Sequence, residues 1–458
     1  MKFLVRDKKF YKSFIAMAAA LALQQLLSYC VNLADNIMLG AYSETALSGS
    51  ALVSQVHYIL QLLINGIGTG IVILGSRYWG MRQSEPIRRL IGIGWKFAVA
   101  LGAAFSAVTM FAPDMVLSIF TNDIDVLKQG HDYLRLMSWT FVIFSASYSL
   151  VWSMRSVETT FIGPVLSAFS LVTNICFNYI FIFGKLGSPE MGIEGAALAT
   201  LISRVAELVL VFIYVLLGDK KLRLSPKDLL RFDSNHLRLY LKVTLPVVGA
   251  LLTFSLGISA QTVILGHTTS AAIAANSIMS IVWQIFAVVG LTCGGASAII
   301  IGKAIGEGKE SLIKSYSITL QCLYVLIGVF SAGILFASRS LILSLYDLSP
   351  ETMELSEKML VALCVVVLCS SYQYPVASGI IQGGGNTGYT FIVDTAAMWF
   401  FALPLAYISA FVIGWSPFVT FCILRSDQCL KVFINGYWVN KRRWFRQLIK
   451  QEKTAAAT

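Results

Sequence analysis

Long apolar runs separated by short loops constrain this chain more than any other feature. A helix needs roughly 20 apolar residues to cross a bilayer, and we predict twelve such spans. They lie near residues 14–39, 51–75, 91–119, 133–155, 162–184, 192–217, 239–264, 276–301, 314–340, 357–380, 389–412 and 416–438. Only 13% of the 458 residues are charged, whereas soluble proteins contain about 25%. The chain is therefore predicted to be an all-α polytopic membrane protein.

The positions of the basic residues predict how the chain is oriented in the membrane. Lys and Arg gather at both termini and in the loops after the second, sixth and eighth spans, while the other loops are neutral or acidic. Since cytoplasmic loops are enriched in Lys and Arg, we expect both termini to be cytoplasmic in a plasma (inner) membrane. The net charge of +11 is spread over short loops rather than one face, so no nucleic-acid partner is expected.

An internal repeat relates the two halves of the chain. A shift of 226 residues aligns "LADNIMLGAYSETALSGSAL" (33–52) with "SAQTVILGHTTSAAIAANSI" (259–278) without a gap. Each half contains six predicted spans, and an even number makes the halves parallel, a plan known among transporters. We therefore predict two pseudo-symmetric six-helix bundles. The predicted boundaries are 1–218 for an N-lobe, 219–238 for a cytoplasmic linker, 239–440 for a C-lobe and 441–458 for a basic cytoplasmic tail.

Asp35 is an acid inside the first predicted span, in the stretch "YCVNLADNIMLG". Gln24, Ser28, Asn32 and Asp35 are spaced by 4, 4 and 3 residues, which places them on one polar stripe of a helix. Such a stripe faces the bundle interior or an aqueous cavity, and an acid within the membrane indicates a functional site. The alternative is a carboxylate that only hydrogen-bonds a neighbouring helix.

The second half of the repeat lacks this carboxylate. The shift of 226 residues pairs Gln24 with Ala250, Ser28 with Phe254, Asn32 with Ile258 and Asp35 with Gln261. The two halves are therefore predicted to share a fold, but only the first half has an acid at this position. We expect any ion-linked step to take place in the N-lobe.

Other polar groups lie within the predicted spans. Asn174 and Asn178 are four residues apart and share a helix face, although they could simply join helices through hydrogen bonds worth about 0.6 kcal/mol each. Arg204 and Glu207 are three apart and are predicted to pair as structural or gating charges. Asp394 is predicted to reach the membrane interface. A local charge cluster is expected in the last span at Arg425, Asp427 and Lys431.

Signatures of soluble catalysis are missing from the sequence. It contains no P-loop, HExxH, GxSxG or metal-ligand cluster, and its eight cysteines form no CxxC pair. We therefore expect no enzymatic activity and no cofactor. Without an ATP site, uphill transport would depend on an ion gradient.

Four segments together resemble the multidrug and toxic compound extrusion (MATE) family, in its prokaryotic form. They are "VNLADNIMLG", "NICFNYIFIFG", "MGIEGAALATLISR" and "MWFFALPLAYIS". The resemblance extends from about residue 10 to residue 445. It implies a V-shaped pair of six-helix bundles that exports amphipathic, often cationic, compounds in exchange for protons or sodium ions.

The resemblance also implies a cation site in the N-lobe. The family's acid, amide pair and hydroxyl match Asp35, Asn174, Asn178 and Thr200, where a proton or possible sodium ion would bind. Some members have an acid in place of Asn178. Others have acids in the seventh and tenth spans, where the corresponding segments "PVVGALLTFSLG" and "CSSYQYPVASG" of this chain contain no carboxylate. The matches are therefore closer to the branch whose coupling site lies in the N-lobe.

The substrate site is predicted from aromatic, Met and Gln side chains within the spans, because side chains of this kind can adapt to varied compounds. The candidates are Tyr29, Met38, Phe254, Gln261, Met279, Trp283 and Gln284. For any one of them, plain helix packing is the alternative. The expected partners are small amphipathic organic substrates and the lipid bilayer, and the expected functional form is a monomer.

These features predict alternating access coupled to cation binding at Asp35. Two other functions remain open. A lipid or lipid-linked oligosaccharide flippase of the same superfamily would have a similar outline, but it would use basic residues in a central cavity to bind phosphate. A membrane-embedded enzyme would need catalytic groups gathered at one depth, and the sequence shows no such group.

Overall fold

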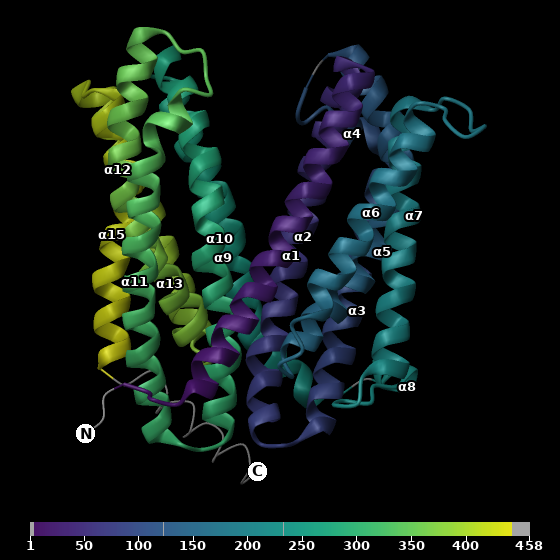
Figure 1. Ribbon diagram of the computed structural model, residues 1–458, viewed down its shortest axis with the longest axis vertical. Helices are drawn as coiled ribbons and strands as arrows, with labels where there is room; N and C mark the ends of the chain where they lie inside the picture. Colours follow the sequence, from purple (N-terminus) through teal and green to yellow (C-terminus); the bar gives the residue numbers. More distant parts are fainter. Residues whose placement is uncertain (1–3, 122, 232, 442–458) are drawn as a thin grey trace. The chain divides into compact units, whose positions relative to one another are not determined.

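The computed structural model describes residues 4–121, 123–231 and 233–441, and within these ranges the regular structure is entirely helical. The predicted tail at 441–458 lies outside the described residues except for Lys441. Long helices run side by side in each half of the chain, as Figure 1 shows. The predicted all-α membrane fold is confirmed.

The first half of the chain contains six long helices joined by short segments. They are α1 (Lys8–Tyr42), α2 (Glu44–Gly80), α3 (Ser84–Phe111), α5 (Ile124–Arg155), α6 (Ile162–Ile182) and α7 (Gly192–Ile213), which the π-helical turn η1 (Tyr214–Gly218) extends. The short helices α4 (Pro113–Leu117) and α8 (Pro226–Leu230) lie in connections.

The second half follows the same order. Its helices are α9 (Ser234–Gly266), α10 (Ser270–Gly306), α11 (Glu310–Leu343), α12 (Pro350–Pro375) with η2 (Val376–Ile381), and α15 (Pro417–Asn440). Between η2 and α15, one span consists of α13 (Thr387–Thr395), η3 (Ala396–Ala402), α14 (Leu403–Tyr407) and η4 (Ile408–Ile413).

Eleven of the helices in the described ranges are long and apolar enough to cross a membrane. Each of them overlaps one of the first eleven predicted spans. The twelfth predicted span is α15, which has 24 residues and includes Arg425, Asp427 and Lys431.

The repeat predicted from the sequence recurs in the helix boundaries. Helices α2 and α10 each have 37 residues, and both ends of α10 lie 226 positions after the ends of α2. The chain also divides into two compact units, and the two division points, at residues 19 and 245, are again 226 positions apart. One unit contains residues 19–244, and the other contains residues 1–18 and 245–458. We call them the N-unit and the C-unit.

This division differs from the predicted boundaries at residues 218 and 239, because it falls inside α1 and α9. The segment after α7 packs on the N-unit instead of forming a separate linker. Lys96 Nζ donates hydrogen bonds of 2.8 and 2.6 Å to the carbonyl oxygens of Leu230 and Arg231. The Tyr240 hydroxyl donates to the Ile67 carbonyl oxygen at 2.8 Å. The start of α9 is thus held by α2 and α3.

An ion pair at the helix ends fixes the same segment. Arg89 Nη1 lies 2.6 Å from Asp233 Oδ2, and this hydrogen bond is the main cause that lowers the pKa of Asp233 to about 2. A carboxylate whose pKa is depressed in the folded state stabilises the fold above its unfolded pKa of about 4. The contribution is lost only as the pH falls through 2, so the pair persists at every physiological pH.

The N-terminal residues pack within the C-unit. The Val5 amide donates to Thr319 Oγ1 at 3.0 Å, and the rings of Phe10 and Tyr316 lie 4.6 Å apart. The sequence alone does not reveal that the first residues contact the ninth span. The predicted boundaries therefore assigned these residues to the N-lobe.

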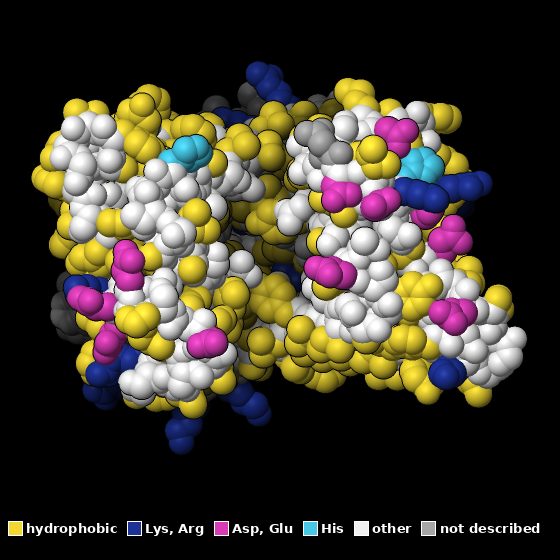
Figure 2. Space-filling view, turned by 90° about the horizontal axis from the view of Figure 1, so that it is seen from above, with side chains coloured by type: hydrophobic (Ala, Val, Ile, Leu, Met, Phe, Trp, Pro, Cys, Tyr) yellow, Lys and Arg dark blue, Asp and Glu magenta, His cyan; other side chains and the backbone are white. Residues whose placement is uncertain are grey.

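The upper end of the C-unit in Figure 1 contains the connection from α11 to α12. Asp347 lies in this connection, and Glu351 lies in the first turn of α12. Figure 2 shows Asp and Glu side chains on the face seen from above. The acidic connection belongs to the set of loops that the charge pattern places on the side opposite the termini.

Replacing Gly92 by alanine will loosen the segment that follows α7. A Cβ atom at this position would lie 2.3 Å from the Asp228 carbonyl oxygen, so α8 must move away from α3. We expect a loss of about 1–3 kcal/mol in stability and faster tryptic cleavage between residues 219 and 233. Gly388→Ala is the matched control, because no atom of a described residue lies within 4 Å of its Cβ position. Equal cleavage of the two variants would contradict the packing described here.

Candidate functional site

Asp35 lies at the junction of three helices of the N-unit. Asn178 Nδ2 on α6 donates to Asp35 Oδ1 on α1 at 2.5 Å. The same Nδ2 lies 3.1 Å from Asn174 Oδ1, and Asn174 Nδ2 lies 3.4 Å from Thr200 Oγ1 on α7. The four residues that the family resemblance implies therefore form one continuous hydrogen-bonded chain, which we call the Asp35 cluster.

Local sequence explains why these side chains meet. Asn174 and Asn178 are one helical turn apart on α6, so they project from the same face. Gly195 lets α7 approach α6 closely, because a Cβ atom there would lie 2.7 Å from the Phe181 carbonyl group. One and a half turns further along α7, this close approach places Thr200 beside Asn174.

The Asp35 cluster is rich in oxygen atoms, and most of its side chains are buried. Asn178 is fully buried and Asn174 nearly so, while Asp35 is half-buried. Asn178 Oδ1 is buried and accepts no hydrogen bond from any described residue. An unpartnered acceptor next to a carboxylate can take a hydrogen bond from a protonated acid or contribute an oxygen ligand to a hard cation. The residues present thus fit either ion.

Tyr133 on α5 belongs beside this cluster, although the sequence analysis missed it. Its side chain is 5% exposed, and its hydroxyl lies beside Thr200. No spacing pattern relates Tyr133 to Asp35 or to the two asparagines, because it lies on a different helix and near the start of a span. Only the packing of α5 against α7 brings it to the site.

The polar stripe of α1 does not act as one unit. Gln24 Oε1 accepts a hydrogen bond of 2.9 Å from Arg155 Nη2, and Ser28 donates to the Gln24 carbonyl oxygen of its own helix. Asn32 is exposed. Within the described residues, only Asp35 of this stripe joins the asparagines, so helix periodicity identified the face but not the members of the site.

Arg204 and Glu207 form an ion pair on α7, with Arg204 Nη1 2.7 Å from Glu207 Oε2. The Arg204 guanidinium also lies 5.1 Å from the centroid of the Phe144 ring, which packs 4.6 Å from the His57 ring. Glu207 is therefore neutralised locally, and Asp35 is the only carboxylate in the Asp35 cluster.

The predicted substrate residues lie in varied surroundings. In the C-unit, Phe254 and Trp283 are half-buried with ring centroids 6.4 Å apart, and Gln284 is exposed. Met279 is fully buried in the hydrophobic core, so it has no surface for a ligand in this structure. Gln261 is 4% exposed and donates to the Leu424 carbonyl oxygen at 3.3 Å.

In the N-unit, Tyr29 and Met38 lie on α1, one before and one after Asn32 along the helix. Tyr29 is 39% exposed and Met38 is half-buried. Both side chains have surface available to a ligand, and neither has a hydrogen bond or ring contact in the described residues that would fix its orientation.

Asp394, predicted to reach the membrane interface, lies beside a buried lysine. Lys431 Nζ on α15 lies 3.5 Å from Asp394 Oδ1 and 2.9 Å from Asp427 Oδ2. The side chains of Lys431 and Asp427 are only 2% and 0% exposed. Because a buried ammonium group needs compensating charges, Asp394 turns toward Lys431. Arg425, predicted to be part of the cluster, forms no ion pair within the described ranges.

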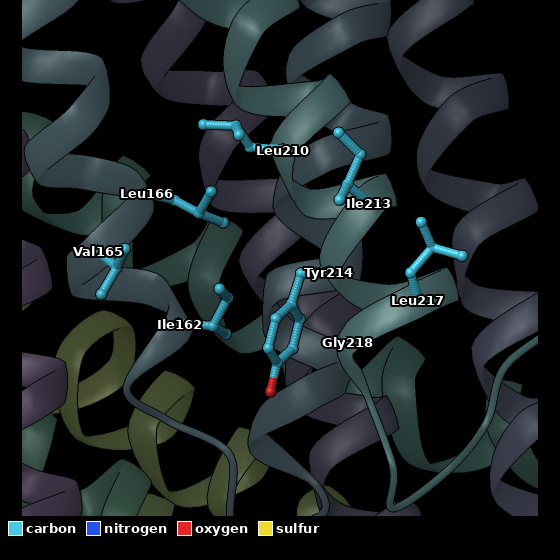
Figure 3. A pocket seen from close by; sticks show the side chains of 8 residues that line it. All are labelled: Ile162, Val165, Leu166, Leu210, Ile213, Tyr214, Leu217 and Gly218. Atoms are coloured by element: carbon cyan, nitrogen blue, oxygen red, sulfur yellow. The ribbon is translucent and has the colours of Figure 1, made fainter.

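A groove of about 420 Å³ lies on the N-unit between α6 and the end of α7. Figure 3 shows its lining, in which Ile162, Val165 and Leu166 of α6 face Leu210, Ile213 and Tyr214. The lining is almost entirely apolar, and none of the predicted site residues contributes to it. The groove therefore lies apart from the Asp35 cluster.

Comparison with known proteins places this architecture among transporters. The protein-family model MatE matches residues 20–180 and 246–408, two segments whose starts are again 226 residues apart. The "Probable multidrug resistance protein NorM" of Thermotoga maritima is 24% identical over 96% of both chains. The "Uncharacterized transporter YisQ" of Bacillus subtilis is 24% identical over 89% of this chain and 90% of its own length.

Solved structures agree with this fold. A crystal structure of MATE in the bent conformation superposes with a TM-score of 0.86 at 17% identity, covering 98% of this chain and 97% of the other. A MOP superfamily transporter from Pyrococcus furiosus, described as having a binding pocket of reverse polarity, superposes with a TM-score of 0.84 over 94% and 95% of the two chains. Since the family model matches most of both halves, the chain belongs to the MATE family of membrane transporters.

Proposed function

We propose that this protein exports amphipathic organic compounds, many of them cationic, in exchange for a proton or a sodium ion. The observation that supports this most strongly is the hydrogen-bonded chain from Asp35 through Asn178 and Asn174 to Thr200. The multidrug resistance names of relatives that cover nearly the whole chain support the substrate class. In this proposal the protein is a plasma-membrane monomer with both termini in the cytoplasm.

Cation binding at Asp35 would change the hydrogen bonding of the cluster. In the present arrangement, Asn178 Nδ2 donates to the carboxylate, while Asn178 Oδ1 has no partner in the described part of the chain. A proton on Asp35, or a sodium ion between the oxygens, favours the opposite orientation of the Asn178 amide, with its oxygen toward Asp35. Rearrangement of this amide then alters how α6 packs against α1.

Coupling requires that the ion distinguishes two states of the transporter. A ligand with equal affinity for both states shifts neither, so the surroundings of Asp35 must differ between the drug-binding and drug-releasing conformations. Such a difference can arise within the Asp35 cluster, because its hydrogen bonds join α1, α6 and α7. Protonation or sodium binding on the outer side would favour the state that releases the drug.

Transport by purified protein in liposomes tests this function directly. We expect a fluorescent organic cation to move against its concentration gradient when a proton or a sodium gradient is imposed, and to stop when that gradient is collapsed. The gradient that supports transport identifies the ion. Dye movement at the rate of protein-free liposomes under both gradients would contradict the proposal.

The flippase alternative is not favoured. Several relatives are called probable multidrug resistance proteins, and the Asp35 cluster offers a cation site rather than a phosphate site. Headgroup transfer of a fluorescent phospholipid in the same liposomes is the matching control, and we expect none.

A further inference from the structure

Cys369 of α12 and Cys429 of α15 place two thiols in direct contact in the C-unit. Their Sγ atoms lie 3.2 Å apart, although the two residues are 60 positions apart in the sequence. Both are free cysteines. Because sulfur atoms in a disulfide are about 2.05 Å apart, a small side-chain rotation would bring these two to bonding distance.

The thiol contact belongs to a packed interface between the two helices. Val366 of α12 and Leu424 of α15 are buried in one hydrophobic core. Beside the thiol pair, Gln373 Nε2 donates a buried hydrogen bond of 2.7 Å to Gln428 Oε1. Since close packing and a buried hydrogen bond keep α12 and α15 together at this level, the two thiols are held next to each other by the fold.

The surface of the C-unit gives access to the thiol pair. Both cysteines are half-buried. Val365, one turn before Cys369, is 55% exposed, and Phe433, one turn after Cys429, is 75% exposed. Residues one turn apart share a helix face, so the pair borders a surface of exposed apolar side chains. A nonpolar reagent can reach the thiols across such a surface.

The depth of the thiol pair selects the kind of reagent that reaches it. Cys369 lies in the middle third of the span Pro350–Ile381, and Cys429 lies in the middle third of α15. The hydrocarbon core of a bilayer is about 30 Å thick, and a charged or strongly polar molecule enters it only at a high cost. A reagent for this pair must therefore dissolve in the bilayer.

We propose that Cys369 and Cys429 are a modification site at which organic hydroperoxides in the bilayer form a disulfide. One sulfur, as its thiolate, attacks the terminal peroxide oxygen, and the O–O bond breaks. This cysteine becomes a sulfenic acid, and the alcohol leaves with the proton of the thiol. The second thiol attacks the sulfenic sulfur, so that the S–S bond forms and water is released. The two thiols lose two electrons, which reduce the hydroperoxide to the alcohol.

The disulfide would link α12 to α15 beside the Gln373–Gln428 hydrogen bond. Both helices belong to the C-unit, so the reaction does not involve the Asp35 cluster of the N-unit. The inference therefore goes beyond the proposed export function and does not depend on it.

Cumene hydroperoxide is a suitable nonpolar probe for the purified full-length protein in liposomes. After treatment, the protein would be unfolded, alkylated and digested, and its peptides analysed by mass spectrometry. We expect the loss of two of the eight thiols and a linked pair of peptides containing Cys369 and Cys429. Dithiothreitol should restore both thiols. The link should form at least tenfold faster than any other cysteine is oxidised, and at least tenfold faster than with oxidised glutathione, which is charged.

Serine variants test the role of each thiol with little change in side-chain size. Cys369→Ser and Cys429→Ser should each lose the linked peptides, and in at least one of them the remaining cysteine should accumulate as a sulfenic acid that dimedone traps. Cys364→Ser/Cys422→Ser is the matched control, because these two half-buried cysteines lie on the same two helices. The control should form the link at the wild-type rate.

Three results would overturn the inference. The first is the absence of the linked peptides from the treated wild-type protein, which needs no variant to fold. The second is oxidation of Cys364 and Cys422 as fast as that of Cys369 and Cys429, because the reaction would then not depend on the contact between two thiols. The third is equally fast linking by oxidised glutathione, because the reagent would then not need to dissolve in the bilayer.

Discussion

Asp35→Asn will abolish ion-coupled export. The substitution keeps the size of the side chain and its ability to accept from Asn178, but it removes the only carboxylate of the Asp35 cluster. Without this group no proton can bind at neutral pH, and a sodium ion loses its only charged ligand. We expect the initial rate of gradient-driven dye export in everted membrane vesicles to fall at least tenfold, while dye binding to the purified variant stays within twofold.

The control for this prediction is Asp114→Asn in α4. Asp114 is exposed at the end of a connection, so the variant loses the same charge without touching the cluster and should export dye at the wild-type rate. Export by Asp35→Asn at a similar rate would show that Asp35 has only a structural role. A parallel loss of dye binding would instead indicate a misfolded variant or a substrate contact.

Lys431→Met will strongly destabilise the C-unit. Lys431 is buried between Asp427 and Asp394, and its removal leaves two acids without a counter-charge. Breaking a buried ion pair by removing one partner costs about 3–5 kcal/mol. We expect a loss of that size in the free energy of unfolding, measured by titrating the purified protein with SDS in mixed micelles.

The double variant Lys431→Met/Asp427→Asn tests whether charge is the cause. Removing Asp427 as well takes away the fully buried acid, so the double variant should recover much of the lost stability. Lys358→Met is the surface control, because its pair with Glu354 is exposed, and it should cost less than about 1 kcal/mol. A double variant as unstable as Lys431→Met would show that packing, rather than charge, accounts for the loss.

Much of the fold could be predicted because its strongest signals are local. Apolar runs of the required length identified the spans, and the ungapped repeat fixed the correspondence of α2 with α10 to the residue. The division of the chain could not be predicted in this way. It depends on contacts such as Tyr240 with Ile67 and Phe10 with Tyr316, which join helices far apart in the sequence.

The site was predictable to the extent that its members share a helix. The spacing on α6 identified Asn174 and Asn178, and an acid in an apolar run identified Asp35. Thr200 was added by family resemblance. Tyr133 and the partnership of Asp394 with Lys431 could not be found, because both depend on which faces of two different helices meet.

The mutual dependence of cation and drug binding tests the central claim most directly. If a cation at Asp35 drives release of the drug, each ligand must weaken the binding of the other by the same factor. Dye affinity of the purified protein would be measured over a series of pH values and of sodium concentrations, for wild type and Asp35→Asn. The account predicts that the coupling ion weakens dye binding to the wild-type protein and leaves Asp35→Asn unchanged. The same ion-dependent shift in both proteins would contradict it.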